Sequence, residues 1–124
     1  MREPLKDKER LNHILAAIDR IKRYSEKKTY NDIIKDDMMY YAIVKNIEII
    51  GEAANMLSSK FLDTHPETPW KLVKGMRNYI VHEYFQIDSM VVWDVVENNI
   101  SVLREQIIKY LSETDWNKWE QGVL

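Results

Sequence analysis

Hydrophobic residues recur every three or four positions along most of the chain, and charged residues fill the positions between them. This spacing is typical of amphipathic helices that bury one face. It first occurs over residues 5–27, where we predict the first helix. The apolar positions there are Leu11, Ile14, Leu15, Ile18 and Ile21.

A second helical stretch follows Thr29. Thr29 and Asp32 have the spacing of a capping box, with Asp in the position usually held by Glu, so a short helix is expected to begin there. The apolar period then continues, and we predict that this helix runs on into a long, buried one that ends near residue 63. The residues that continue the helical spacing are Met38, Ala42, Ile43, Ile47, Ile50, Ala54, Leu57 and Phe61.

Two prolines in the segment HPETP, residues 65–69, predict a loop, because proline disfavours helix at its own position and at the residue before it. Thr68 is a candidate N-cap, with Pro69 at the first position of a third helix that reaches about residue 83. Asp88 or Ser89 is expected to cap a fourth helix to about residue 112. The apolar residues of this fourth helix are Val92, Val95, Val96, Ile100, Leu103, Ile107, Ile108 and Leu111.

The predicted fold class is therefore all-α, a four-helix, up-and-down bundle-like domain that spans residues 1–124. The final stretch, from about residue 113, is predicted as either a short extra helix that packs Trp116 and Trp119 against the bundle or a partly ordered tail. A composition of 45% hydrophobic and 31% charged residues, with three glycines and three prolines, is consistent with a folded helical protein.

The composition also narrows the class of function. The chain has no cysteine, which excludes disulfides and cysteine-based metal sites, and no apolar segment resembles a signal peptide or a membrane span. We therefore expect a cytoplasmic protein without membrane contact. The net charge of −2 is unevenly distributed: residues 1–28 carry nine basic and five acidic residues, whereas residues 83–124 carry three basic and eight acidic ones. The excess of +4 at the front indicates either a basic binding surface or an ordinary solvated helix face.

The segment RNYIVHEY concentrates the residues with the clearest chemistry: Arg77, Asn78, His82 and Tyr84. An enzyme that cleaves a phosphodiester without a metal needs a group that transfers protons and a cation that stabilises the developing charge on phosphorus, and His and Arg suit these roles. In RNA the 2′-hydroxyl can serve as the nucleophile. A structural hydrogen-bonded pair of Arg and His is the alternative interpretation.

Other polar or small residues have simpler interpretations. Glu48 and Glu52 share a helix face, which indicates an exposed acidic ridge rather than a di-metal site, since no Glu-x-x-His pattern accompanies them. Gly51 indicates a close helix crossing. His13 and His65 are expected on the surface or in loops. We expect Tyr40 and Tyr41 to pack against the core, with the lining of a groove as the alternative.

The segment GMRNYIVHEYFQID resembles the R-x4-H-x-Y motif of the HepT-like toxins, a branch of the HEPN superfamily. The similarity extends over nearly the whole chain and includes EIIGEAANMLS, FLDTHPETPWKLVKGMRN and VVWDVV, in the family's order. The resemblance implies an all-α homodimeric endoribonuclease that cleaves RNA, such as a tRNA or mRNA, without a metal or other cofactor. Arg77 and His82 take the catalytic positions, Tyr84 takes the third position, and Asn78 is an accessory candidate.

The same resemblance implies a partner. HepT-like proteins are toxins of type II or VII-like toxin-antitoxin pairs, and a minimal nucleotidyltransferase antitoxin neutralises them by transferring AMP to the motif tyrosine. Tyr84 is therefore expected to be a site of AMPylation and nucleotide binding. The alternative function is a helical subunit that binds a nucleotidyltransferase or a nucleotide without cleaving anything. The acidic net charge favours this alternative, and the intact motif favours the enzyme.

Helical geometry gives an independent constraint on the motif. At 100° per residue, Arg77 and Tyr84 lie within about 20° of each other around a straight helix, whereas His82 lies about 140° from Arg77. One straight helix therefore does not gather all three side chains. Either the helix ends near His82, or a second copy completes the site across a two-fold axis. The family resemblance favours the dimer.

Overall fold

The structure is a computed structural model that describes residues 6–77 and 89–122. All secondary structure in these two ranges is helical, which confirms the all-α class. The expectations for Asn78, His82, Tyr84 and Asp88 lie outside the described residues. Among the described helices, none combines the length and the apolar character that a bilayer crossing requires.

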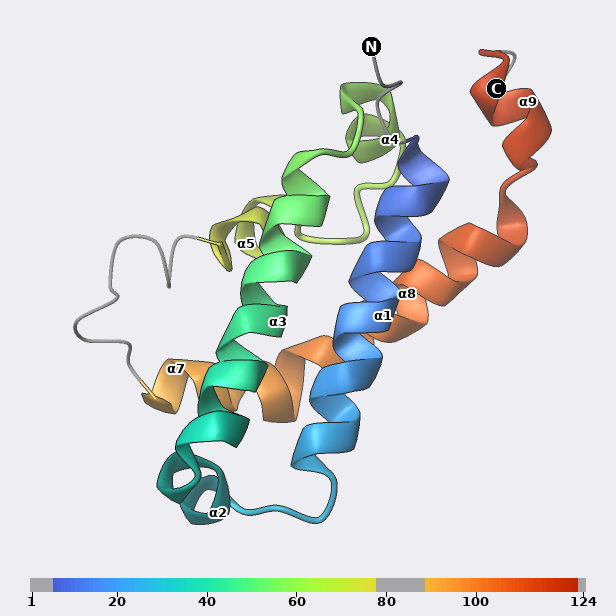
Figure 1. The fold of residues 1–124 in the computed structure, drawn as a ribbon. Coiled ribbons are helices and arrows are strands. Elements are labelled where there is room, and N and C mark those ends of the chain that lie inside the picture. Colours follow the sequence, from blue (N-terminus) through green and yellow to red (C-terminus); the bar gives the residue numbers. More distant parts are fainter. Residues whose placement is uncertain (1–5, 78–88, 123–124) are drawn as a thin grey trace, which may run out of the picture.

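Two long antiparallel helices, α1 (Asp7–Ser25) and α3 (Asp37–Asn55), lie side by side, and α8 (Ile100–Glu113) passes behind α1 in the view of Figure 1. The predicted first helix is thus confirmed. Their apolar stripes form the core, as the hydrophobic period requires. The core side chains of α1 and α3 are at most 4% exposed: Leu11, Ile14, Ala17, Ile18, Ile21, Ile43, Val44, Ile47, Ile50, Ala53 and Ala54.

The short helix α2 (Tyr30–Lys35) begins with the capping box that the sequence predicts. The backbone N–H of Thr29 donates to Oδ2 of Asp32 at 2.9 Å, and the backbone N–H of Asp32 donates to Oγ1 of Thr29 at 3.1 Å. The hydrogen bonds of Thr29 also lower the pKa of the Asp32 carboxyl, because they stabilise its charged form.

The predicted continuous helix to residue 63 is wrong, because α3 ends at Asn55 and a separate helix, α4, spans Ser59–Thr64. Ser58 is the cause of the new start. Its Oγ accepts the backbone N–H of Phe61 at 3.1 Å and donates to Oδ2 of Asp7 at 2.6 Å, so the side chain caps α4 and ties it to α1.

The predicted fourth helix consists of α7 (Ser89–Asp94), a π-helical turn η1 (Val95–Asn99) and α8. In the π turn the backbone N–H of Ile100 donates to the carbonyl of Val95, five residues earlier. The wider turn advances the buried stripe directly from Val95 to Ile100, which are 5% and 1% exposed. Val96, expected in the core, is therefore only half-buried, and Ile108 is 39% exposed.

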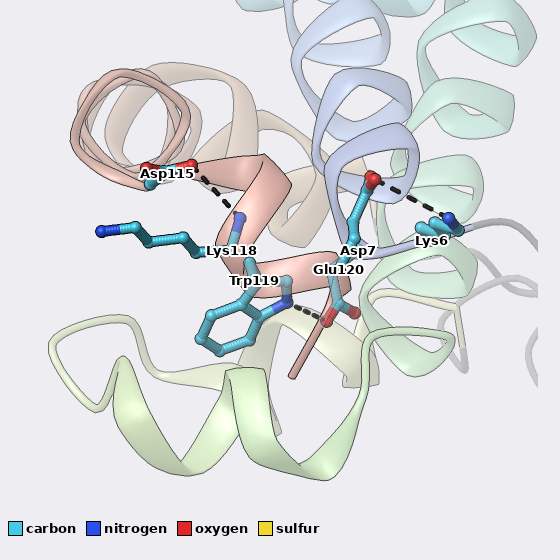
Figure 2. Close-up of polar contacts among 6 residues, drawn as sticks. All are labelled: Lys6, Asp7, Asp115, Lys118, Trp119 and Glu120. Atoms are coloured by element: carbon cyan, nitrogen blue, oxygen red, sulfur yellow. Dashed lines mark hydrogen bonds and ion pairs between the residues drawn. The ribbon is translucent and has the colours of Figure 1, made fainter. Parts of the chain in front are cut away.

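The chain then forms a short terminal helix, α9 (Trp116–Glu120), which confirms the first of the two interpretations for this region. Both tryptophans pack against Phe61, with ring centroids 6.4 Å from Trp116 and 5.6 Å from Trp119. The indole N–H of Trp119 donates to Oδ2 of Asp7 at 3.0 Å, and Figure 2 shows this contact beside the ion pair of Lys6 and Glu120. The helix is thereby fastened to the start of α1.

Candidate active site

The loop of residues 65–69 fixes the start of α5 (Trp70–Gly75), the helix that leads to Arg77. Thr68 is 2% exposed, and its hydroxyl lies 2.5 Å from the phenol oxygen of Tyr110 and 2.8 Å from Oε1 of Gln106. The prediction that Thr68 caps α5 is wrong. Pro69 holds the N-cap position, and the Thr68 hydroxyl is used instead to bind the loop to α8.

An aromatic cluster around Phe61 packs against the same loop. Phe61 is fully buried, the ring of His65 stacks on it at 3.9 Å, and Tyr110 meets it edge-on at 5.7 Å. Nδ1 of His65 also lies 2.8 Å from the carbonyl oxygen of Phe61, and the indole N–H of Trp70 donates to the carbonyl of His65 at 2.8 Å. His65 lies in the predicted loop but has a structural role there, and His13 is exposed as expected.

The predicted continuous third helix to about residue 83 is wrong, because α5 ends at Gly75, Met76 is its C-cap and Arg77 follows in a turn. Trp70 and Val73 of α5 and its C-cap residue Met76 are 7%, 3% and 6% exposed, so the chain is buried up to the residue before Arg77. The backbone N–H of Arg77 donates to the carbonyl of Lys74 at 3.3 Å and continues the turn. Arg77 itself is half-buried, and its guanidinium forms no ion pair or hydrogen bond with the described residues.

Gly51 of α3 packs directly against the backbone of Arg77. A Cβ atom at Gly51 would lie 2.9 Å from Cβ and 3.0 Å from Cα of Arg77, and nearer still to its amide nitrogen. The expected close crossing at Gly51 is thus confirmed, and the element that crosses is the chain at Arg77. Figure 1 shows α5 beside α3 in the half of α3 that contains this glycine.

Two lysines precede Arg77 on α5 at intervals of three residues. Lys71 is exposed, and Lys74 is half-buried. A groove of about 190 Å³ lies between α5 and the segment formed by η1 and α8. Its walls are apolar on the α5 side, and carboxamides contribute on the other. The lining residues are Pro69, Leu72, Val73, Met76, Asn98, Asn99, Val102, Leu103 and Gln106.

The remaining polar candidates do not join Arg77. Glu48 pairs with Lys45 at 3.5 Å, and Glu52 is exposed, so the two glutamates form a partly solvated face as expected. Within residues 6–77 and 89–122, no three His, Asp or Glu side chains gather in a way that could hold a metal ion. Tyr40 packs against the core, whereas Tyr41 is 61% exposed, so the expected core packing is wrong for Tyr41.

The basic residues near the end of α1 do not form a uniformly positive surface. Lys22, Arg23 and Arg104 line a shallow depression together with Asp19 and Glu26. Arg104 donates to Oδ1 of Asp19 at 2.7 Å, with both side chains 38% exposed, and Lys22 donates to the hydroxyl of Ser101 at 3.1 Å. This surface corresponds to the solvated helix face rather than to the basic binding surface.

Comparison with known proteins identifies the family of this chain. The family described as "Ribonuclease HepT-like" matches the chain over residues 14–110, which include most of α1, all of α2 to α5 and most of α8. The chain therefore belongs to the ribonuclease HepT-like family. Arg77, Asn78, His82 and Tyr84 all lie within the matched residues. No solved structure gives a significant match.

Three relatives illustrate the similarity. A "probable ribonuclease HepT" of Thermococcus cleftensis is 32% identical over 82% of this chain and 93% of its own length. A "putative RNase" of Caldanaerobacter subterraneus is 35% identical over 83% of this chain and 92% of its own length. A "gamma-glutamylcyclotransferase and putative RNase" of Methanocaldococcus jannaschii is 38% identical over 87% of this chain. The chain spans only 49% of that longer protein.

Proposed function

We propose that this protein is the toxin subunit of a toxin-antitoxin pair and acts as a metal-independent endoribonuclease. The observation that carries the proposal is the state of Arg77. Its backbone is held between Met76 and Gly51, while its guanidinium has no partner among the described residues. A cation that is fixed at its base and unpaired at its tip is suited to bind a phosphate. The family membership and the relatives named as RNases support RNA as the source of that phosphate.

In the proposed reaction His82 accepts the proton of a 2′-hydroxyl, and the resulting oxygen attacks the adjacent phosphorus. Arg77 stabilises the negative charge that develops on the pentacovalent phosphate. The bond from phosphorus to the 5′-oxygen then breaks, and the proton that His82 accepted passes to this oxygen as it leaves. The products are a 2′,3′-cyclic phosphate and a free 5′-hydroxyl, so the reaction needs no water and no metal-bound nucleophile.

We further propose that the active unit is a homodimer. The membership in the HepT-like family supports this proposal, since the resemblance implies a homodimer whose site is completed across a two-fold axis. In such a dimer, His82 of one copy and Arg77 of the other can act on the same phosphate. A two-fold axis makes the two shared sites equivalent.

The proposed partner is a minimal nucleotidyltransferase antitoxin that transfers AMP to Tyr84. The added AMP is a bulky anion two residues from His82. Its phosphate can form charge-assisted hydrogen bonds with the Arg77 guanidinium and so compete with a substrate phosphate. Neutralisation is then both steric and electrostatic.

The proposal is tested by incubating the purified protein with matched RNA and DNA oligonucleotides in EDTA. RNA should be cleaved and DNA should stay intact, because only RNA carries the 2′-hydroxyl. Cleavage that disappears in EDTA and returns with magnesium would contradict the metal-independent mechanism. A protein that binds the nucleotidyltransferase but cleaves no RNA would instead be a non-catalytic binding subunit.

A further inference from the structure

Gly51 and Gly75 are both helical glycines, and they have very different surroundings. A Cβ at Gly51 would meet the backbone and Cβ of Arg77, whereas a Cβ at Gly75 would meet nothing within 4 Å. The obstacle at Gly51 is main chain, which cannot rotate away as the end of a flexible side chain can. Glycine therefore has a specific steric reason to occupy position 51 and no such reason to occupy position 75.

The location of Gly51 adds to this contrast. It is buried in the interior of α3, between the core residues Ile50 and Ala54, where glycine weakens a helix relative to alanine. Helix stability alone thus favours alanine at this position. The close approach of Arg77 is the feature of the structure that only glycine accommodates.

We propose that Gly51 is a positioning residue for Arg77, and this inference rests on the proposed ribonuclease function. Ordinary contact to a Cβ begins at about 3.4 Å, so a methyl group at position 51 must displace the Arg77 backbone by roughly 1 Å. The chain before Arg77 is held in place by the buried Met76 and by the hydrogen bond from the Arg77 N–H to the carbonyl of Lys74. The displacement therefore falls on Arg77 itself, and its guanidinium moves with its backbone. A displacement of about 1 Å in a catalytic group lowers a reaction rate by roughly 100-fold.

The experiment compares Gly51→Ala with Gly75→Ala in the full chain. Both variants add one methyl group to a helical glycine. The methyl group meets the Arg77 backbone at position 51 and nothing within 4 Å at position 75. Circular dichroism and thermal unfolding establish that each variant is folded, and kcat and KM for RNA cleavage are then measured. We expect Gly51→Ala to lower kcat about 100-fold, with KM changed by less than about threefold, and Gly75→Ala to match the wild type.

A double-mutant cycle with Arg77→Ala separates positioning from a general effect on the fold. Alanine at position 77 keeps the backbone and Cβ that Gly51 contacts but removes the guanidinium. If Gly51 acts through the guanidinium, Gly51→Ala will reduce the residual activity of Arg77→Ala by less than about twofold. A further 100-fold loss in that background would overturn the proposal, because the effect would not depend on the guanidinium.

Two other results would also overturn the proposal. A folded Gly51→Ala variant with the activity of the wild type would show that the displacement does not reach the site. A Gly51→Ala chain that fails to fold would make Gly51 a residue of the fold rather than of the site. In either case cleavage by the wild type would leave the proposed function intact, whereas a wild type that cleaves no RNA would refute that function first.

Discussion

The hydroxyls of Tyr110 and Thr68 lie 2.5 Å apart in a buried hydrogen bond that joins α8 to the loop in front of α5. The two residues are 42 positions apart in the sequence, so the bond links regions that only the fold brings together. The same phenol lies 3.3 Å from Oε2 of Glu67, and Gln106 donates to the carbonyl of Glu67 at 3.1 Å. This network determines where α5 begins, and α5 in turn leads to Arg77.

Removal of the phenol oxygen should destabilise the protein measurably. Tyr110→Phe keeps the ring against Phe61 but leaves part of a buried polar network without its partner, which costs about 1–3 kcal/mol. Denaturation in urea measures the free energy of unfolding. Tyr24→Phe is the matched control, because the Tyr24 hydroxyl forms no hydrogen bond within the described residues, and its effect should stay below about 0.5 kcal/mol. Equal effects of the two variants would contradict the role of the network.

Alkaline pH should weaken the protein through the same residue. Burial raises the pKa of the Tyr110 phenol, and the carboxylate of Glu67 acts in the same direction. A group whose pKa is raised by folding contributes stability that is fully present below its unfolded pKa, near 10, and is lost as the pH rises through the folded pKa. Melting temperatures between pH 8 and 11 should therefore fall more steeply for the wild type than for Tyr110→Phe. Parallel curves would contradict this assignment.

Asp7 should contribute more to stability than its neighbour Lys6. Asp7 accepts hydrogen bonds from Trp119 and from both the backbone and the hydroxyl of Ser58, whereas Lys6 forms a single 3.7 Å ion pair with Glu120 (Figure 2). Asp7→Ala should lower the free energy of unfolding by about 1–2 kcal/mol and increase the solvent exposure of Trp119. Lys6→Ala should cost less than about 0.5 kcal/mol, because exposed ion pairs contribute little. Acrylamide quenching of tryptophan fluorescence measures the exposure. Unchanged quenching in Asp7→Ala would contradict the role of Asp7 in holding α9 against α1.

The sequence could predict the elements whose signals are local. The capping box at Thr29 and Asp32 and the apolar period of α1 depend on neighbours a few residues apart, and both were predicted correctly. The break before α4 was missed, because Leu57 and Phe61 continue the apolar period across it. The Ser58 cap that causes the break depends on Asp7, which is 51 residues away.

The site divides in the same way. Gly51 was recognised as a close crossing from its small side chain, and Arg77 came from the motif. That the two residues contact each other depends on how α5 packs against α3, which no local pattern records. The hydrogen bond of Thr68 to Tyr110 was missed for the same reason, since the sequence Thr-Pro has the form of a helix start.

Tyr84→Phe should resist neutralisation by the antitoxin's enzymatic activity. The substitution keeps the ring and removes the oxygen that would accept AMP, so the variant should still cleave RNA. After incubation with the cognate nucleotidyltransferase and ATP, intact-mass spectrometry should show added AMP on the wild type and none on Tyr84→Phe. Equal modification of both chains, or neutralisation of the wild type without any gain in mass, would contradict the proposed switch.

The central claim is that the Arg77 guanidinium acts on a phosphate of RNA, and cleavage by Arg77→Ala in EDTA tests it most directly. His82→Ala serves as the second active-site variant. Arg104→Ala is the matched control, since it removes an arginine that is already paired with Asp19 on the solvated face. Circular dichroism verifies the fold of each variant, and analysis of the RNA ends identifies the product.

The account predicts 2′,3′-cyclic phosphate ends from the wild type and from Arg104→Ala. It predicts a loss of cleavage of about 100-fold or more in Arg77→Ala and His82→Ala, with helical content preserved. A folded Arg77→Ala variant that cleaves RNA as fast as the wild type would contradict the central claim.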